Sequence, residues 1–195
     1  MHYPITFSFK ILALAPQISV HDAQGQLLWY VKQALFKLRE SVTVFGDERQ
    51  TQALFSINAD RVLDISARYH IADAQGIGLG AVQRHGMRSF WSAHYEVLDH
   101  TGSVTLSIRE ENPWVKVIDG LMGEIPVVGM LTGMFFQPAY LVTRLDGLVA
   151  LRVAKQRSLL ESKFHVEQQS ELSRSEELLA LLSIMMMILL ERARG

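Results

Sequence analysis

The C-terminal run SEELLALLSIMMMILLERARG constrains the fold of this chain more than any other stretch. From Leu178 to Leu190 only Ser183 is not apolar. A helix over this run has no polar face. It must therefore be buried on every side, either in lipid or in the middle of a protein fold.

Length and flanking residues favour the protein interior. The thirteen residues 178–190 span about 20 Å as a helix, whereas a bilayer core of about 30 Å needs about 20 apolar residues. Ser173 and Glu176 have the spacing of a capping box, and Arg192 and Arg194 follow at the negative end of the helix dipole. We predict a helix over 173–193 that the rest of the chain encloses.

The rest of the chain has the two-residue period of β-strands. Apolar and polar residues alternate over 63–71, 104–109, 149–153 and 164–167. Such alternation predicts strands with one buried face and one face toward water. Strands of this kind are the expected cover for the apolar helix.

Turn sequences separate these strands. Asp22–Gly25, Asp73–Gly76 and Asp99–Gly102 share an Asp, two residues and a Gly between apolar runs. Asp accepts backbone hydrogen bonds at the start of a turn, and Gly adopts the positive φ at its end. These segments are predicted to be hairpin tips, and Asp146-Gly147 and residues 46–49 are predicted to turn two further pairs.

The predicted fold class is mainly β with one central α-helix. We count ten to twelve strands, most of them too close together in sequence for helical crossovers. A flat sheet covers one side of a helix, whereas a closed barrel covers all sides, and eight strands leave room only for their own side chains. The sequence therefore predicts one domain over 1–195: a closed antiparallel β-barrel of about 12 strands over 1–172, and the hydrophobic C-terminal helix over 173–193.

Composition narrows the functional classes. The formal net charge is −1, which argues against a nucleic-acid binder. The chain has no cysteine, so disulfides, thiolate catalysis and Cys-based zinc sites are excluded. Residues 11–14 are too short for the apolar part of a signal peptide, and a cytoplasmic location is expected.

No catalytic or cofactor motif stands out. The chain lacks G-x-S-x-G and H-E-x-x-H motifs, and GIGLG at 76–80 leads into a predicted strand, not into the helix that a dinucleotide loop needs. His70, His85, His94 and His100 lack the spacing of metal ligands. Glu110 and Glu111 are neighbours on a strand and point in opposite directions. We expect no enzyme activity, no metal and no cofactor.

Basic residues provide the functional hypothesis. In LFKLRE, Phe36 and Leu38 are expected to point inward, which turns Lys37 and Arg39 outward together. Lysine and arginine make charge-assisted contacts with phosphate oxygens. The candidate lipid-phosphate residues are Lys32, Lys37, Arg39, Arg84 and Arg88. The alternative is a solvated strand face with no ligand.

The apolar run Ile125–Phe136 allows another interpretation. It contains Gly129 and Gly133 in the small-x-x-x-small spacing of membrane helices. Pro126 and Pro138 interrupt it, however, and leave only a short uninterrupted stretch. We predict a buried crossover or a plug at the barrel end, with a membrane-touching loop as the alternative.

Six stretches carry a resemblance to a known family. They are YPITFSFKILALAPQISV, LFKLRE, SARYHIADAQG, IREENPWVKVIDGLMGEIPVVG, PAYLVTR and LLALLSIMMMILLERARG. Together they resemble the prokaryotic branch of the LURP-one-related family, which shares the tubby C-terminal fold with phospholipid scramblases. The resemblance implies a barrel around a hydrophobic helix, and tubby proteins bind phosphoinositide headgroups through outward basic residues.

The expected function is a non-enzymatic binding or interaction module. Its expected partners are anionic phospholipid or phosphoinositide headgroups. The expected location is the cytoplasm, with peripheral binding to a membrane surface. Two alternatives stay open: a scramblase-like membrane protein, which the resemblance suggests, and a small-ligand-binding protein or enzyme without a recognisable motif. Neither the oligomeric state nor any protein partner can be predicted from the sequence.

Overall fold

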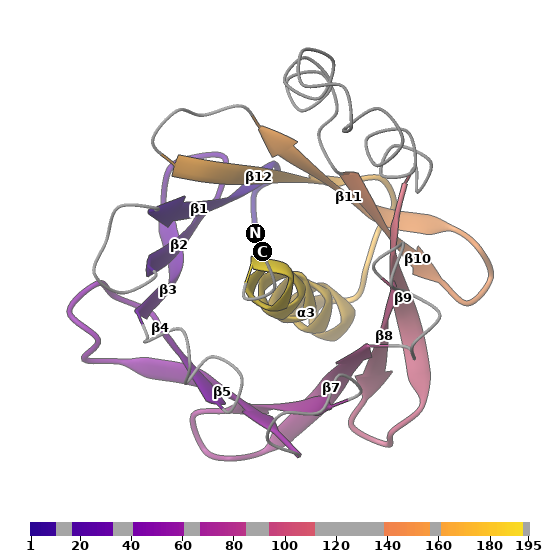
Figure 1. Cartoon of the computed structure of the whole chain (residues 1–195), viewed down its shortest axis with the longest axis horizontal. Helices are drawn as coiled ribbons and strands as arrows, with labels where there is room; N and C mark the ends of the chain where they lie inside the picture. Colours follow the sequence, from indigo (N-terminus) through magenta and orange to yellow (C-terminus); the bar gives the residue numbers. More distant parts are fainter. Residues whose placement is uncertain are drawn as a thin grey trace, which may run out of the picture.

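The C-terminal apolar run is a helix in the middle of a closed barrel (Figure 1). The structure is a computed structural model of the whole chain, and the described residues are 1–10, 17–32, 41–60, 67–84, 94–111, 139–156 and 161–192. Figure 1 looks down the barrel and shows the strands on all sides of the helix α3. The predicted fold class is confirmed.

Twelve strands and one helix make up the described chain. They are β1 (Ile5–Lys10), β2 (Gln17–His21), β3 (Leu27–Lys32), β4 (Ser41–Phe45), β5 (Ala53–Ala59), β6 (Arg68–Asp73), β7 (Gly78–Arg84), β8 (His94–Asp99), β9 (Val104–Glu110), β10 (Ala139–Arg144), β11 (Val149–Gln156), β12 (Glu161–Gln168) and α3 (Arg174–Arg192). Each strand pairs antiparallel with its neighbours in sequence, and β1 pairs with β12 to close the barrel. The sheet therefore has no free edge.

The alternation of apolar and polar residues along each strand determines which side chains face the core and which face water. On β1, Ile5, Phe7 and Phe9 are buried, and on β9 Leu106 and Ile108 are fully buried. Direct partners across each strand pair lie on the same face, so these residues meet the inward residues of neighbouring strands. The resulting inner wall is apolar around most of its circumference.

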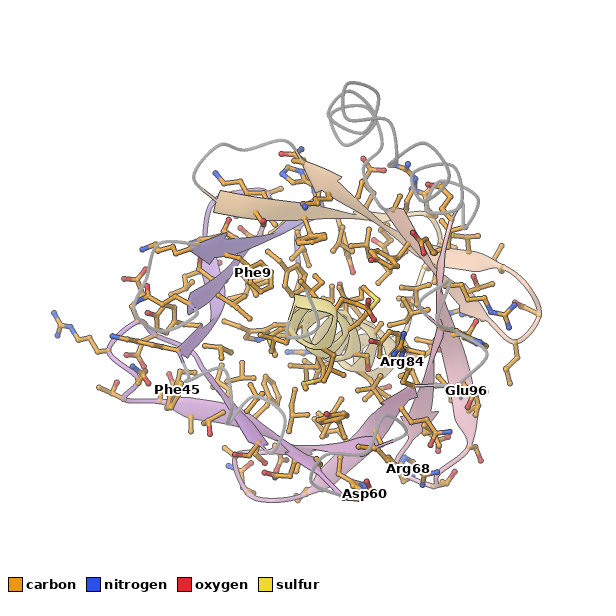
Figure 2. All side chains as sticks on the ribbon, viewed as in Figure 1. Phe9, Phe45, Asp60, Arg68, Arg84 and Glu96 are labelled. Carbon is orange, nitrogen blue, oxygen red and sulfur yellow. The ribbon has the colours of Figure 1, made fainter. Side chains whose placement is uncertain are left out.

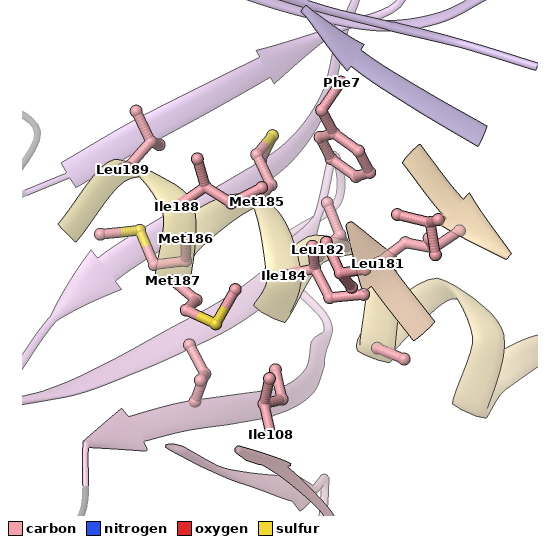
Figure 3. Close-up of a cluster of buried hydrophobic side chains, with 14 of the residues drawn as sticks. Phe7, Ile108, Leu181, Leu182, Ile184, Met185, Met186, Met187, Ile188 and Leu189 are labelled. Carbon is pink, nitrogen blue, oxygen red and sulfur yellow. The ribbon is translucent and has the colours of Figure 1, made fainter. Parts of the chain in front are cut away.

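The helix fills this wall from the inside. Every residue from Ala180 to Leu189 is at most 3% exposed, Ser183 included. Figure 3 shows Met187 directed toward Ile108, and Met185 in the region of Phe7. The helix is the centre of the hydrophobic core rather than a cover on one side of it.

The start of the helix has the predicted cap. The Ser173 backbone N–H donates to the Glu176 carboxylate at 2.9 Å, and the Glu176 N–H donates to the Ser173 hydroxyl at 3.3 Å. Arg144 also contacts Glu176 at 3.3 Å. These hydrogen bonds hold the pKa of Glu176 below its ordinary value. The capping box satisfies amides that a helix start leaves unpaired.

The predicted hairpin tips are confirmed. Gly25, Gly76 and Gly102 donate to the backbone oxygens of Asp22, Asp73 and Asp99, each at 3.0 Å. These glycines have φ of 78°, 81° and 84°, a conformation that other residues rarely adopt. The turn predicted at Asp146-Gly147 is closed by Gly147 N–H and the Arg144 oxygen at 3.0 Å. The start of the strand predicted over 63–71 and the run Ile125–Phe136 fall outside the described residues.

Antiparallel order places these turns at one end of the barrel. The turns 22–26, 46–52, 74–77, 100–103 and 145–148 lie there together with the start of α3. We call this the turn end. We call the end where α3 finishes the opposite end. The segments that connect the strands there lie outside the described residues.

Truncating Leu182 tests the role of the helix as the core. We expect Leu182→Ala to lower the free energy of unfolding by about 2–5 kcal/mol, because Leu182 is 0% exposed and its removal leaves a cavity. Urea denaturation measures this loss.

Ser183→Ala is the matched control on the same helix. Its hydroxyl is buried without a hydrogen-bond partner among the described residues, so replacing it should be neutral or stabilising by up to about 1 kcal/mol. Leu145→Ala, at a residue 74% exposed, should change stability by less than about 0.5 kcal/mol. Equal losses in all three variants would contradict an enclosed helix.

Candidate functional site

The candidate basic residues lie in different surroundings. Lys32 is exposed at the last position of β3, and Arg84 is the last residue of β7. Three strands separate β3 from β7, so these two residues do not form one cluster. Lys37, Arg39 and Arg88 lie outside the described residues, and their role stays a prediction.

Arg84 points into the barrel. It shares one face of β7 with Val82, which is fully buried, and with Gly80. A Cβ at Gly80 would touch Leu179 of the helix, so this face looks toward α3. Figure 2 shows Arg84 between the wall and the helix, and its side chain is only 11% exposed. Arg84 is thus separated from the exposed basic residues of the outer wall.

Arg84 faces an acidic side chain of the helix. Its guanidinium lies 3.9 Å from the Glu191 carboxylate, and the Tyr95 hydroxyl donates to the same carboxylate oxygen at 2.6 Å. Tyr95 is the direct partner of Arg84 across the β7–β8 pair. A carboxylate near the last turn of a helix meets the negative end of the helix dipole. The tyrosine and the arginine offset this repulsion and fix the depth of the helix in the barrel.

A second polar pair lies beside Arg84, Tyr95 and Glu191 inside the barrel, and we call the five residues the inner polar ring. Glu110 is 8% exposed and Tyr140 5% exposed, and they are direct partners on β9 and β10. Burial, together with Glu191 and Glu110, raises the pKa of Tyr140 above its ordinary value. Burial and the neighbouring Glu191 also raise the pKa of Tyr95. Both hydroxyls therefore keep their protons, and the Tyr95 hydroxyl donates to Glu191.

The two-residue period of the strands is a sequence signal for this inner polar ring. Glu110 continues the inward series Leu106 and Ile108, and Arg84 continues Gly80 and Val82. Residues two apart on a strand share a face. The period of two therefore predicts both polar residues inside the barrel. What it cannot predict is that Glu191 lies at the same depth.

The turn end is strongly acidic. Ten carboxylates and three arginines lie in its turns, in the adjoining strand ends and in the first turn of α3, which gives a formal charge of −7. The carboxylates are Asp22, Asp47, Glu48, Asp73, Asp99, Asp146, Glu167, Glu171, Glu176 and Glu177, and the arginines are Arg49, Arg144 and Arg174.

The opposite end carries a positive formal charge. Within about three residues of the strand and helix ends, the residues whose side chains are described include seven lysines and arginines and five carboxylates, a formal charge of +2. The basic residues are Lys10, Lys32, Arg68, Arg84, Arg109, Lys155 and Lys163, and the acidic ones Asp60, Glu96, Glu110, Glu111 and Glu191. In sequence, the six internal segments that join strands at this end add six basic and four acidic residues. The net charge of −1 hides this separation.

Several outer polar groups are paired with one another. Arg68 donates to Gln83 at 2.9 Å, and Gln83 donates to Glu96 at 2.9 Å, along the outside of β6, β7 and β8. Arg152 contacts Glu111 at 3.0 Å, whereas neighbouring Glu110 is buried inside the barrel; the two side chains point in opposite directions, as predicted. Such pairs stabilise a sheet surface modestly.

No group of three metal-binding side chains occurs in the described part of the chain. Likewise, none of its helices is both long and apolar enough to cross a bilayer.

Comparison with known proteins gives a likeness of fold. No family model matches the chain, and no curated protein matches it either. Among solved structures, the chain is similar to the X-ray structure of a protein from Arabidopsis thaliana. The match covers 97% of this chain and 91% of that chain, at 14% identity and a TM-score of 0.50. At this identity the likeness concerns the barrel and its helix alone.

The buried tyrosines predict instability in alkali. Burial raises the pKa of Tyr3, Tyr95 and Tyr140 above the ordinary value. Above pH ~10 the unfolded chain loses these protons first, so stability falls as pH rises, by about 1.4 kcal/mol per pH unit for each tyrosine. Below pH ~10 these groups contribute no pH dependence.

Urea denaturation between about pH 10 and 12 measures this slope. We expect Tyr95→Phe to remove about a third of it, whatever the variant does to stability at neutral pH, because Tyr95 is one of the three tyrosines with strongly raised pKa values. An unchanged slope would mean that Tyr95 ionises as easily in the folded protein as in the unfolded chain.

Proposed function

We propose that this protein is a non-enzymatic binding module that docks on anionic phospholipid headgroups through the opposite end of its barrel. The separation of charge between the two ends carries the proposal. An end of +2 opposes an end of −7, so an anionic surface attracts the first and repels the second. The protein then approaches a membrane in one orientation.

Distance makes this orientation effective. Strands of five to eight tilted residues place the two ends about 13–20 Å apart along the barrel axis. The Debye length in the cell is about 8 Å. When the opposite end contacts a membrane, the acidic turn end is therefore largely screened from the lipid charges.

Exposed lysines at this end supply the contacts. Lys10 and Lys32 end β1 and β3 and are exposed. Each lysine or arginine close to an anionic membrane contributes about 1 kcal/mol. Binding through a few such residues is weak and reversible, as suits a peripheral cytoplasmic protein. Lys37, Arg39 and Arg88 belong to segments whose flanking strands finish at this same end.

We infer in addition that the chain is related to the LURP-one-related proteins with their tubby-like fold. The six sequence stretches support this relation, and the likeness to the plant protein supports the fold that it requires. Headgroup binding by outward basic residues in tubby proteins is consistent with the proposed docking.

Vesicle binding tests the proposal. We expect sedimentation with vesicles of phosphatidylcholine and phosphatidylserine at low salt, and none with phosphatidylcholine alone. Binding should disappear at about 1 M salt, where the Debye length is about 3 Å. Lys10→Glu/Lys32→Glu should weaken binding at least tenfold, because it reverses two charges at the docking end.

Arg49→Glu is the matched control. Arg49 is exposed at the turn end, so the same charge reversal should leave vesicle binding nearly unchanged. A Lys37→Ala/Arg39→Ala variant tests the pair predicted from the sequence. Equal weakening by Arg49→Glu and by the lysine variant, or no binding of the unmodified protein at low salt, would disprove the docking model.

A further inference from the structure

Three consecutive methionines lie in the centre of the core, and we call them the methionine triplet. Met185, Met186 and Met187 are each 0% exposed. Successive residues of a helix point about 100° apart, so the three side chains leave α3 in different directions. Figure 3 shows Met187 directed toward Ile108 of β9 and Met185 in the region of Phe7 of β1. The triplet therefore meets the barrel wall on several sides at once.

Packing alone does not require methionine at these positions. Leucine and methionine have similar volumes and replace one another in cores at low cost. Leucine and isoleucine fill the same wall from neighbouring positions, at Leu182, Ile184 and Leu189. Methionine differs from them in its thioether, which peroxides oxidise. The chain has no cysteine, so its sulfur chemistry is confined to methionine.

Hydrogen peroxide converts a methionine thioether into a sulfoxide. The O–O bond of the peroxide breaks, one oxygen atom becomes bonded to the sulfur, and the other leaves as water. The sulfur is oxidised by two electrons, and the peroxide is reduced by two. The product side chain is polar and chiral, whereas methionine itself is apolar and flexible.

The core accommodates such a polar group only at a high cost. A polar group that is buried without a hydrogen bond destabilises the folded state. Ser183 shows this situation on the same helix, because its hydroxyl is buried and has no partner among the described residues. The wall around the triplet is mostly apolar. Three sulfoxides, each bulkier than a hydroxyl, therefore prevent the barrel from closing around α3.

The closed barrel protects the triplet from oxidation. Strands surround α3 on all sides, and the sheet has no free edge (Figure 1). Opening the wall on one side exposes at most part of the triplet, because its side chains point in different directions. Only opening of the whole barrel exposes all three sulfurs together. Met1, by contrast, is 48% exposed in the folded protein.

We propose that the methionine triplet is a redox-sensitive switch for folding: peroxide oxidises it only before the barrel closes, and the oxidised chain cannot close until its sulfoxides are reduced. The folded protein is insensitive to the same peroxide. Methionine sulfoxide reductases make the switch reversible, because two thiols are oxidised to a disulfide while the sulfoxide oxygen leaves as water. This inference concerns folding and does not depend on headgroup binding.

Oxidation rates in the folded protein test the protection. The full chain is treated with hydrogen peroxide, and peptide mass spectrometry measures the rate at each methionine, relative to its rate in unfolding urea. We expect each residue of the triplet to be oxidised at least about a hundredfold more slowly than Met1, because exposure requires the whole barrel to open. The three relative rates should agree within about twofold, since one opening exposes all three. A triplet residue oxidised as fast as Met1, or far faster than the other two, would overturn the inference.

Refolding tests the switch itself. The chain is oxidised in urea, the peroxide is removed, and the urea is diluted; size-exclusion chromatography and circular dichroism measure the yield of folded protein. We expect a yield below about a tenth of that of the unoxidised chain, because three unpaired polar groups must be buried. The two sulfoxide reductases, one for each epimer, should restore the yield in the presence of dithiothreitol. Full refolding of the oxidised chain would overturn the inference.

Met185→Leu/Met186→Leu/Met187→Leu is the matched control. It keeps the five other methionines, which are Met1, Met87, Met122, Met130 and Met134. After the same peroxide treatment, its refolding yield should stay within about twofold of the untreated variant, because leucine conserves the volume and cannot be oxidised. An equal loss in this variant would assign the effect to other methionines and overturn the inference.

Reductase treatment of the unsubstituted chain gives the same answer without a substitution, should the triple variant not fold. Peptide mass spectrometry during the recovery shows which sulfoxides have disappeared when folded protein returns. We expect folding to follow the loss of sulfoxide from the triplet. Recovery while the triplet is still oxidised would overturn the inference. Neither result affects the proposed docking, which vesicle binding of the folded, unoxidised protein tests separately.

Discussion

A helix without a polar face can be kept from water only by cover on every side. Thirteen nearly uninterrupted apolar residues in α3 impose this requirement, and the antiparallel barrel meets it with a wall that has no open edge. Strand number follows from the same demand, because eight strands close on their own side chains and leave no room for a helix. The number of strands and the closure of the barrel thus both follow from the need to bury α3.

Local patterns were sufficient to predict most of this architecture. Alternation located the strands, the Asp-x-x-Gly turns located their ends, and the Ser173 and Glu176 pair located the start of the helix. The candidate site was harder to predict. Lys32 is exposed, but Arg84 is directed at Glu191, more than a hundred residues later in the chain. Contact between residues so distant in sequence depends on the depth of the helix in the barrel, which no local pattern specifies.

The acidic end of the molecule follows from the chemistry of its turns. Asp22, Asp73 and Asp99 each accept backbone N–H groups with one side-chain oxygen, at 2.8 to 3.0 Å. A meander of antiparallel strands sends every second connection to the same end. Reuse of one stable turn therefore concentrates negative charge there, and the basic residues remain for the other end. The charge difference between the two ends of the barrel therefore follows from the turn chemistry itself.

The position of the core helix in the sequence has a consequence for synthesis. Strand β1 closes the barrel against β12, and the side chains that fill the interior come after both. While α3 is still inside the exit tunnel of the ribosome, the strands that precede it have no helix to pack around. The core can therefore form only after α3 has left the tunnel, and until then chaperones can bind the exposed inner faces of the strands.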